Sequence, residues 1–214
     1  MPRLRFRLCR RHSRIVIDVR LAGSGDWQVW RKLRLEALAD APYAFASRLE
    51  DWQGDGDRAE RWRARLSIPG SCNVIAALDR RAVGMVSGFP GPRDGVVELG
   101  TLWVSRAVRG QGVGDLLVQT VAHWAVQLRA SVLLLTVASD NEHAVALYRR
   151  NGFDDARWSG GPRVAGRPQR MMTKALRPSR VETRTPALVS TSRENASPAT
   201  PRRVRRQPFP PGSE

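Results

Sequence analysis

The sequence predicts one α/β domain built on a single mixed sheet rather than a doubly wound one. The chain has 214 residues, of which 42% are hydrophobic and seven are tryptophans, and this suits one domain with a sizeable core. Apolar runs with the periods of strands and of helices alternate in the order β-α-α-β-β-β-α-β-α-β-β. That order indicates a single mixed sheet with helices packed on it.

The first half of the chain is expected to hold a strand, two helices and a hairpin. In chain order, the predicted elements are the strand 15–21, the helices 27–39 and 57–66, and the strands 73–78 and 82–88. Apolar residues of the first helix fall on one broad face, and Gly25 and Asp26 before it form a plausible N-terminal cap. The polar segment 79–81 between the last two apolar runs predicts a hairpin.

The second half is expected to complete the sheet. In chain order, the predicted elements are the strand 96–104, the helix 112–128, the strand 132–137, the helix 141–150, and an antiparallel pair, 153–158 with 170–176. The run VLLLTV at 132–137 is uniform enough to be buried on both faces, which suggests a central, partly parallel strand. Asn151 and Gly152 form a good C-cap for the last helix.

The basic charge of the chain is concentrated at its two ends. The formal net charge is +16, but residues 1–14 hold six arginines and no acid, and residues 178–214 hold seven arginines against three glutamates. About +6 remains for residues 15–177, which weakens the case for nucleic-acid binding by that part. We expect a basic, unstructured extension at 1–14, a domain at 15–177, and a disordered tail at 178–214, where seven prolines interrupt any apolar period.

Cysteine usage and hydropathy indicate the compartment. Cys9 and Cys72 have no CxxC spacing and no nearby histidine pair, which argues against a zinc site or a disulfide framework and suits a reducing cytoplasm. Charged residues interrupt the apolar stretch near the N-terminus, so a secretory signal is not expected. The longest apolar run, residues 132–138, is far shorter than the roughly 20 residues that cross a bilayer. We therefore expect a cytoplasmic protein with no membrane partner.

The stretch RAVRGQGVGD at residues 106–115 lies between a predicted strand and a predicted helix. A glycine-rich loop in that position presents backbone N–H groups at a helix N-terminus, where the helix dipole favours anions. Gly110, Gly112 and Gly114 do not fit the Walker A or Rossmann loops, because the Lys, the Ser or Thr and the glycine spacing that those loops need are missing. From the loop alone, a phosphate cradle and a plain turn explain the glycines equally well.

Three segments, in order, resemble the signatures of one family. Arg109 to Gly114 is similar to the motif R/Q-x-x-G-x-G, and residues 98–104 (ELGTLWV) resemble the strand before it. Residues 137–153 (VASDNEHAVALYRRNGF) resemble a second signature that runs from an Asn through Leu-Tyr to Gly-Phe. The family is the GNAT superfamily of acyl-CoA-dependent N-acetyltransferases, and the resemblance spans about residues 15–177. It implies a mixed, largely antiparallel sheet of about six to seven strands flanked by about four helices.

The same resemblance implies acetyl-CoA as a co-substrate and no metal. It implies that amides from Gly110 to Asp115 bind the CoA pyrophosphate, that the backbone of residues 102–104 pairs with the pantetheine arm, and that an N–H near Val104 polarises the thioester carbonyl. Asn141 would contact the pantetheine arm, although a helix cap alone also explains it. The implied cofactor-binding residues are Leu102, Trp103, Val104, Arg109, Gly110, Gln111, Gly112, Val113, Gly114, Asp115 and Asn141.

Tyr148 and Glu98 are the candidate catalytic residues. Tyr148 follows Asn141 by two helical turns on the same face, where its phenol could protonate the departing thiolate. The alternative is a tyrosine with its ring in the core and its hydroxyl in water. Glu98 lies in an otherwise apolar strand and could take a proton from the incoming ammonium, directly or through a water. A solvent position, or an ion pair with an arginine, explains Glu98 equally well.

The sequence says less about the acceptor. The first two helices of the family usually shape acceptor specificity, so the first candidates are Tyr43, Phe45, Asp51 and Trp52. Four tryptophans could line an acceptor pocket but are more typical of a core: Trp27, Trp30, Trp52 and Trp62. Surface or packing roles are expected for His12, His123 and His143, because none has ligand spacing.

The leading hypothesis is an N-acetyltransferase that moves the acetyl group of acetyl-CoA to a primary amine by direct attack in a ternary complex. The acceptor is left open among small molecules, antibiotics and protein amino groups. The alternative is a non-catalytic acyl-CoA-binding sensor or partner module with the same fold. Nucleic acid is expected at most as a weak, salt-dependent partner of the arginine-rich ends, and a homodimer is left open.

Overall fold

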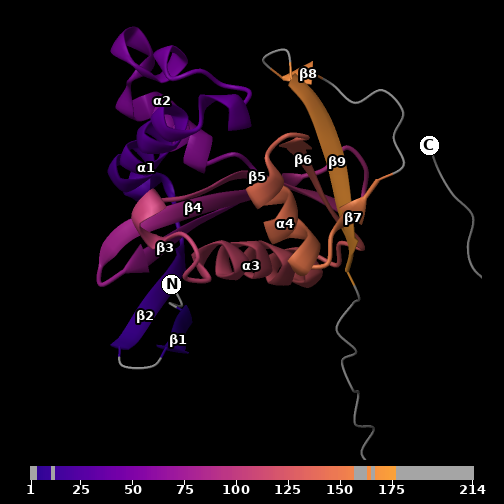
Figure 1. The fold of residues 1–214 in the computed structure, drawn as a ribbon. Coiled ribbons are helices and arrows are strands. Elements are labelled where there is room, and N and C mark those ends of the chain that lie inside the picture. The colour runs from indigo at the N-terminus through magenta and orange to yellow at the C-terminus, as the bar shows by residue number, and fades with distance from the viewer. Residues whose placement is uncertain (1–3, 11–12, 157–162, 165–166, 177–214) are drawn as a thin grey trace, which may run out of the picture. The chain divides into compact units, whose positions relative to one another are not determined.

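The computed structural model describes residues 4–10, 13–156, 163–164 and 167–176 (Figure 1). The chain separates into two units, Met1–Ser179 and Arg180–Glu214. The second unit lies outside the described residues, so disorder of the tail at 178–214 stays a prediction.

A single mixed sheet forms the centre of the first unit. Its strands follow the order β1-β2-β3-β4-β5-β6-β9-β7, and β8 pairs with β9. Among the described strand pairs, β5–β6 is parallel and the others are antiparallel. This confirms the predicted sheet. The strands are β1 (Leu4–Arg10), β2 (Ser13–Leu21), β3 (Cys72–Leu78), β4 (Arg81–Pro90), β5 (Val96–Val104), β6 (Val132–Ala138), β7 (Asp154–Asp155), β8 (Arg163–Val164) and β9 (Arg167–Ala175).

Helices cover both faces of this sheet (Figure 1). They are α1 (Trp27–Asp40), α2 (Ala59–Leu66), α3 (Val113–Gln127) and α4 (Glu142–Arg150). All four were predicted. The C-terminal cap of α4 also matches the prediction, since Asn151 ends the helix and Gly152 follows with a φ of +83°, a left-handed conformation that glycine adopts without strain.

The two faces of the sheet bury two separate hydrophobic clusters. On one face, Trp30 and Trp62 of α1 and α2 pack with Ile75 and Met85 of the sheet. On the other face, α3 and α4 pack against residues that include Val86, Leu99 and Leu135. Full burial of such a side chain contributes about 1.5–3 kcal/mol relative to exposure. The two clusters therefore fix the helices on which the candidate site depends.

The predicted unstructured N-terminal extension is wrong for residues 4–10. These residues form β1, which pairs antiparallel with β2 from Leu4 opposite Val19 to Arg10 opposite Ser13. The sequence LRFRLCR alternates apolar and basic residues with the period of a strand, and the neighbouring edge of β2 offers unpaired backbone groups. The prediction of an unstructured extension rested on the basic composition and did not take this alternation into account.

The prediction for β6 is only partly confirmed. The strand is central, lying between β5 and β9, and it is parallel to β5 as expected. Burial on both faces is wrong, because Leu133 and Leu135 are buried while Leu134 is half-buried and Thr136 is exposed. Helix α1 packs on β4 rather than on β6, so the second face of β6 stays partly open.

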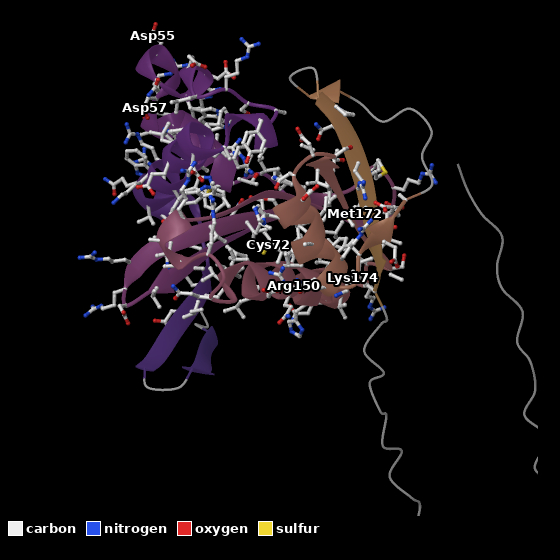
Figure 2. The ribbon with its side chains drawn as sticks, viewed as in Figure 1. Asp55, Asp57, Cys72, Arg150, Met172 and Lys174 are labelled. Carbon is white, nitrogen blue, oxygen red and sulfur yellow. The ribbon has the colours of Figure 1, made fainter. Side chains whose placement is uncertain are left out.

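No described helix combines the length and the apolar character that crossing a membrane requires. Cys72 is buried as a thiol in β3 (Figure 2), and burial raises its pKa to about 12. The side chain of Cys9 lies outside the described side chains.

Candidate active site

The strands β5 and β6 stop pairing part-way along their length. Their ladder joins Val96–Glu98 of β5 to residues 132–134 of β6, although β5 continues to Val104 and β6 to Ala138. Two neighbouring strands that stop pairing each present an edge of backbone N–H and C=O groups. An extended ligand can bind to such an edge in the way that an added strand does. This divergence is the central feature of the candidate site.

A bulge in β5 lies beside the divergence. Met85 opposes Trp103 and Ser87 opposes Gly100, so one residue of β4 faces two residues of β5. One of these two, Thr101, has a φ of +58°, which is rare for a β-branched residue and costs about 1–3 kcal/mol. Bulges bend the strand and re-aim the groups that follow.

The backbone of Val104 is directed into the space between β5 and β6. The Ser105 N–H donates to the Val83 carbonyl at 2.8 Å, and Gly84 opposes Val104 in the ladder. In an antiparallel pair the hydrogen-bonded positions alternate, so the N–H and C=O of Val104 point away from β4. Arg109 Nε donates to that carbonyl at 3.0 Å. The N–H of Val104 therefore faces the space between β5 and β6.

The glycine-rich loop connects β5 to α3 through the short helix η5 (Arg106–Val108). Gly110 and Gly112 have φ values of +75° and +82°, so both need the freedom of glycine. Gly112 is the N-cap of α3 and supplies no side-chain cap, which leaves the first-turn amides to another acceptor. Gly114 has a different role, because a Cβ there would lie 3.1 Å from Leu147 of α4. The loop therefore presents an uncapped, anion-favouring helix end.

The side chain of Arg109 turns back from this loop to Asp40 at the end of α1. Asp40 accepts hydrogen bonds from Trp103 Nε1 at 2.9 Å, from Arg106 and from Arg109. Burial alone would raise the pKa of Asp40, but these hydrogen bonds outweigh it and hold the pKa below its usual value. Asp40 thus fixes the start of the loop to α1.

The carboxylate of Asp115 is likewise bound to the protein. Arg150 Nε and Nη2 donate to its two oxygens at 2.6 and 2.8 Å, and Asn151 Nδ2 donates at 2.8 Å. The hydrogen bond from Arg150 lowers the pKa of Asp115. Figure 2 shows Arg150 beside α3, with Lys174 of β9 nearby, and Lys174 Nζ donates to the Asn151 carbonyl at 2.7 Å. The Asp115 side chain joins α3 to α4, so a contribution of Asp115 to an anion site would come from its backbone.

Tyr148 and Asn141 both lie on α4. Asn141 is its N-cap and accepts from the Ala144 N–H at 3.2 Å, so the cap role is present whether or not the residue also binds a ligand. The ring of Tyr148 is buried and meets Phe153 edge-on, with 5.7 Å between the ring centroids. Burial raises the pKa of Tyr148 far above its usual value, so the phenol stays protonated at neutral pH. Within the described residues, its hydroxyl makes no hydrogen bond.

Glu98 is the last residue of β5 that pairs with β6. It opposes Phe89 across the ladder to β4 and is exposed, on the same face of the sheet as α1 and α2. It forms no ion pair or hydrogen bond with another described residue, so the ion-pair alternative is not found there. A carboxylate at the point where two strands separate can reach a ligand that enters between them.

Two arginines of the α1–α2 layer belong to this region, and sequence reasoning did not assign them. Arg65 donates to Asn73 Oδ1 at 3.1 Å, to Ser87 Oγ at 3.1 Å and to Thr101 Oγ1 in the bulge at 3.2 Å. Arg34 is buried on the sheet-facing side of α1. An arginine among the apolar positions of a helix was the available signal.

The other predicted acceptor residues divide between core and surface. Trp30 and Trp62 are core, and Trp52 lies against Trp62 with 4.4 Å between ring centroids, while Trp27 is partly buried. Phe45 is buried and Tyr43 is exposed, on or just after η2 (Pro42–Ala44), which contacts β6. Asp51 is exposed and accepts from the Arg48 N–H at 2.8 Å. His123 and His143 are exposed, and His12 lies outside the described residues.

Comparisons with known proteins decide the family. The model of the acetyltransferase (GNAT) family matches residues 30–153. The chain belongs to the GNAT acetyltransferase family. The match confirms the resemblance and covers every part of the site described above, from α1 to the end of α4. In the part of this GNAT chain that the structure describes, no three His, Cys, Asp or Glu side chains gather as metal ligands would.

Individual relatives are more distant. The N-acetylaspartate synthetase of Homo sapiens is 28% identical over 162 residues, which is 72% of this chain and 54% of that protein. The mycothiol acetyltransferase of Jonesia denitrificans is 38% identical over 130 residues, 56% of this chain and 41% of that protein. The PaiA N-acetyltransferase of Thermoplasma acidophilum, solved in complex with coenzyme A, has a TM-score of 0.59 at 16% identity and covers 74% of this chain and 98% of its own. The chain spans about half the length of the curated relatives it matches.

Proposed function

We propose that this GNAT protein transfers the acetyl group of acetyl-CoA to a primary amine by direct attack in a ternary complex. The observation that carries the proposal is the divergence of β5 and β6 next to the uncapped N-terminus of α3. One feature suits an extended pantetheine arm and the other a pyrophosphate, and both belong to one molecule of acetyl-CoA.

The residues present fit that co-substrate. The amides from Gly110 to Asp115 would hold the pyrophosphate, since the left-handed glycines turn the loop and the N-cap Gly112 has no side chain of its own to cap the helix. The backbone of residues 102–104 would pair with the pantetheine arm on the side away from β4, where the Val104 carbonyl already accepts from Arg109. The side-chain amide of Asn141 would add a contact, because its oxygen is occupied by the helix cap while its nitrogen can still donate.

Three groups of this chain then have separate roles in the acyl transfer. Glu98 takes a proton from the acceptor ammonium, directly or through a water, and the neutral nitrogen attacks the thioester carbonyl carbon. The Val104 N–H stabilises the negative oxygen that develops. The C–S bond breaks as the amide forms, the Tyr148 phenol protonates the departing sulfur, and the proton that the amide nitrogen loses restores the phenol. The products are the N-acetylated amine and CoA with a free thiol.

Burial keeps the Tyr148 phenol protonated, so it can donate a hydrogen bond to the sulfur as the C–S bond breaks. The same raised pKa makes the phenol a weaker acid than a free tyrosine. The same burial would suit a packing role, so the two must be separated by experiment.

The first test measures thiol release. Purified protein, acetyl-CoA and a panel of amines should yield free thiol and the acetylated amine, and no binding at millimolar acetyl-CoA would contradict the proposal. Tyr148→Phe keeps the ring in place, so it should lower kcat by about 10²- to 10⁴-fold while the Kd for acetyl-CoA is retained. Binding without turnover in either protein would instead support the alternative of an acyl-CoA sensor.

Location and partners stay predictions. We propose a cytoplasmic protein on the basis of its cysteine usage. A homodimer, and a weak contact of the arginine-rich ends with nucleic acid, remain untested. The names of the relatives indicate different acceptors, so the acceptor has to be inferred from this chain's own residues.

A further inference from the structure

Arg34 is a buried charge without a hydrogen-bonding partner among the described residues. Its side chain belongs to α1, the residue is 8% exposed, and the Nη1 atom is buried with no acceptor near it. Its guanidinium carbon lies 4.4 Å from the centroid of the Phe45 ring. An arginine has five N–H donors, and a buried ion left without acceptors is costly. Keeping this charge buried and unpaired therefore lowers the stability of the ligand-free protein.

Arg65 brings a second positive charge to the same region. Its three acceptors, Asn73, Ser87 and Thr101, are all neutral, and its guanidinium carbon lies 4.7 Å from the centroid of the Phe89 ring. Burial, with a smaller contribution from the charge of Arg65, lowers the pKa of Arg34 to about 10, and burial lowers the pKa of Arg65 to about 10. The two cations are therefore within electrostatic range of each other.

The nearby carboxylates do not neutralise this pair. Asp57 accepts from Arg31 and from Trp62 (Figure 2 places it in the α1–α2 layer), and Asp40 accepts from Trp103, Arg106 and Arg109. Glu98 pairs with neither arginine. Two like charges in a region of low dielectric, with the local acids engaged elsewhere, leave an uncompensated positive potential.

This potential lies on the acceptor side of the proposed catalytic centre. Phe89, on which Arg65 stacks, is the direct cross-strand neighbour of Glu98, and Thr101, to which Arg65 donates, lies in the bulge of β5. Phe45, on which Arg34 stacks, follows η2, and η2 contacts β6. The arginines and Glu98 thus border the same side of the opening between β5 and β6.

We infer that Arg34 and Arg65 form a subsite for a carboxylate of the acceptor, and that the acceptor is a small amine that carries a carboxylate, as a free amino acid does. The inference rests on the proposed function and names the substrate class of that site. A guanidinium fork matches a carboxylate with two parallel N–H···O bonds, and the ligand would supply the acceptors that Arg34 lacks. The ammonium of the same molecule would lie toward Glu98. A polyamine, which has only positive charges, would be repelled.

The experiment compares matched acceptors by thiol release. Alanine, phenylalanine, aspartate and glutamate are each tested against the corresponding α-carboxamide, which keeps the size and removes the charge of the α-carboxylate. We expect the acid of at least one pair to have a kcat/KM roughly tenfold to a hundredfold higher than its amide, mainly through KM. Because the amine of an α-carboxamide is the less basic one, its greater neutral fraction works against this result and cannot produce it.

Variants connect the preference to the subsite. Arg34→Gln should lower the acid-to-amide ratio by roughly tenfold or more while the amide is acetylated as before, and Arg34→Lys, which keeps the charge and loses the fork, should fall between. Lys32 is an exposed lysine on the same helix, so Lys32→Gln is the control for net charge and should keep the acid-to-amide ratio. In thermal unfolding, the preferred acid should raise the Tm of the wild type and not of Arg34→Gln.

The outcomes separate this inference from the proposed function. Thiol release with equal rates for acids and amides, or with polyamines preferred, overturns the carboxylate subsite and leaves the acetyltransferase. An Arg34→Gln protein that loses acid and amide activity equally, with a lower Tm, assigns the arginine to structure alone. If that variant does not fold, the wild-type ratio and Arg34→Lys decide the question. No thiol release with any amine refutes the proposed function itself.

Discussion

Gly112→Glu tests whether the loop before α3 binds the pyrophosphate of acetyl-CoA. Gly112 is the N-cap of α3, has a φ of +82° and contributes no side chain. A glutamate there brings a negative charge to the end of the helix that the proposal reserves for an anion. The variant should fold, since loops of this kind tolerate backbone strain, but it should no longer bind acetyl-CoA.

Two contributions to the free energy can be separated. A side chain in the left-handed region costs about 1–2 kcal/mol of folding stability. A carboxylate about 5 Å from two phosphate charges, at an effective dielectric constant of about 40, adds about 3 kcal/mol of repulsion to binding. That repulsion corresponds to a rise in Kd of roughly a hundredfold or more.

Isothermal titration with acetyl-CoA measures the effect on binding, and thermal unfolding measures the effect on folding stability. Gly112→Gln has the same strain and bulk without the charge, so the ratio of the two Kd values isolates the electrostatic contribution. Gly54→Glu is the remote control, because Gly54 also has a positive φ, +54°, and a Cβ there meets no atom within 4 Å. It should lose stability and keep its affinity. A Gly112→Glu protein that binds acetyl-CoA like the wild type would refute the cradle.

Two further predictions concern carboxylates of the α1–α2 layer and its junction with the loop. Asp40→Asn should weaken acetyl-CoA binding by roughly three- to tenfold, because the start of the loop loses a charged hydrogen-bond acceptor, and an unchanged Kd would contradict that role. Hydrogen bonds from Arg31 and Trp62 lower the pKa of Asp57 to about 2. Its folded-state pKa is below the unfolded value, so its contribution to stability is present above about pH 4 and is lost as the pH falls toward 2. Asp57→Asn should therefore be less stable than the wild type by about 1–2 kcal/mol at pH 6, with the difference shrinking near pH 2 in denaturant unfolding.

The elements that sequence analysis predicted correctly have strong local patterns. Helix α4 has its own cap residues at both ends, and β5 and α3 lie directly before and after the glycine-rich motif. The errors come from features that depend on neighbours. For β1, the high arginine content led to the prediction of an unstructured segment despite the alternation of apolar and basic residues. For β6, the composition alone could not show which face of the strand a helix would cover.

The candidate site divides in the same way. The glycine-rich turn between β5 and α3 could be predicted because its glycines lie within a few residues of one another and their conformation is a local property. The hydrogen-bond partners of the Arg109 and Asp115 side chains could not be predicted. The acceptor of Arg109 lies 69 residues away in the sequence, and the donor to Asp115 lies 35 residues away. Arg34 and Arg65 were missed for a related reason. Whether a charge is buried without an acid depends on how α1 and α2 pack, and neither helix shows that by itself.

The position of Asp40 explains why the two substrate regions cannot be treated as independent. Helix α1 carries Arg34 toward the acceptor side and ends at Asp40, which binds Trp103 in β5, 63 residues further along the chain. Trp103 precedes Val104, whose N–H points into the opening between the strands. The same carboxylate holds Arg109 at the start of the cofactor loop. The partly buried side chain of Asp40 therefore links the carboxylate subsite inferred for the acceptor to the groups proposed to hold the thioester, and direct transfer needs their separation to be fixed.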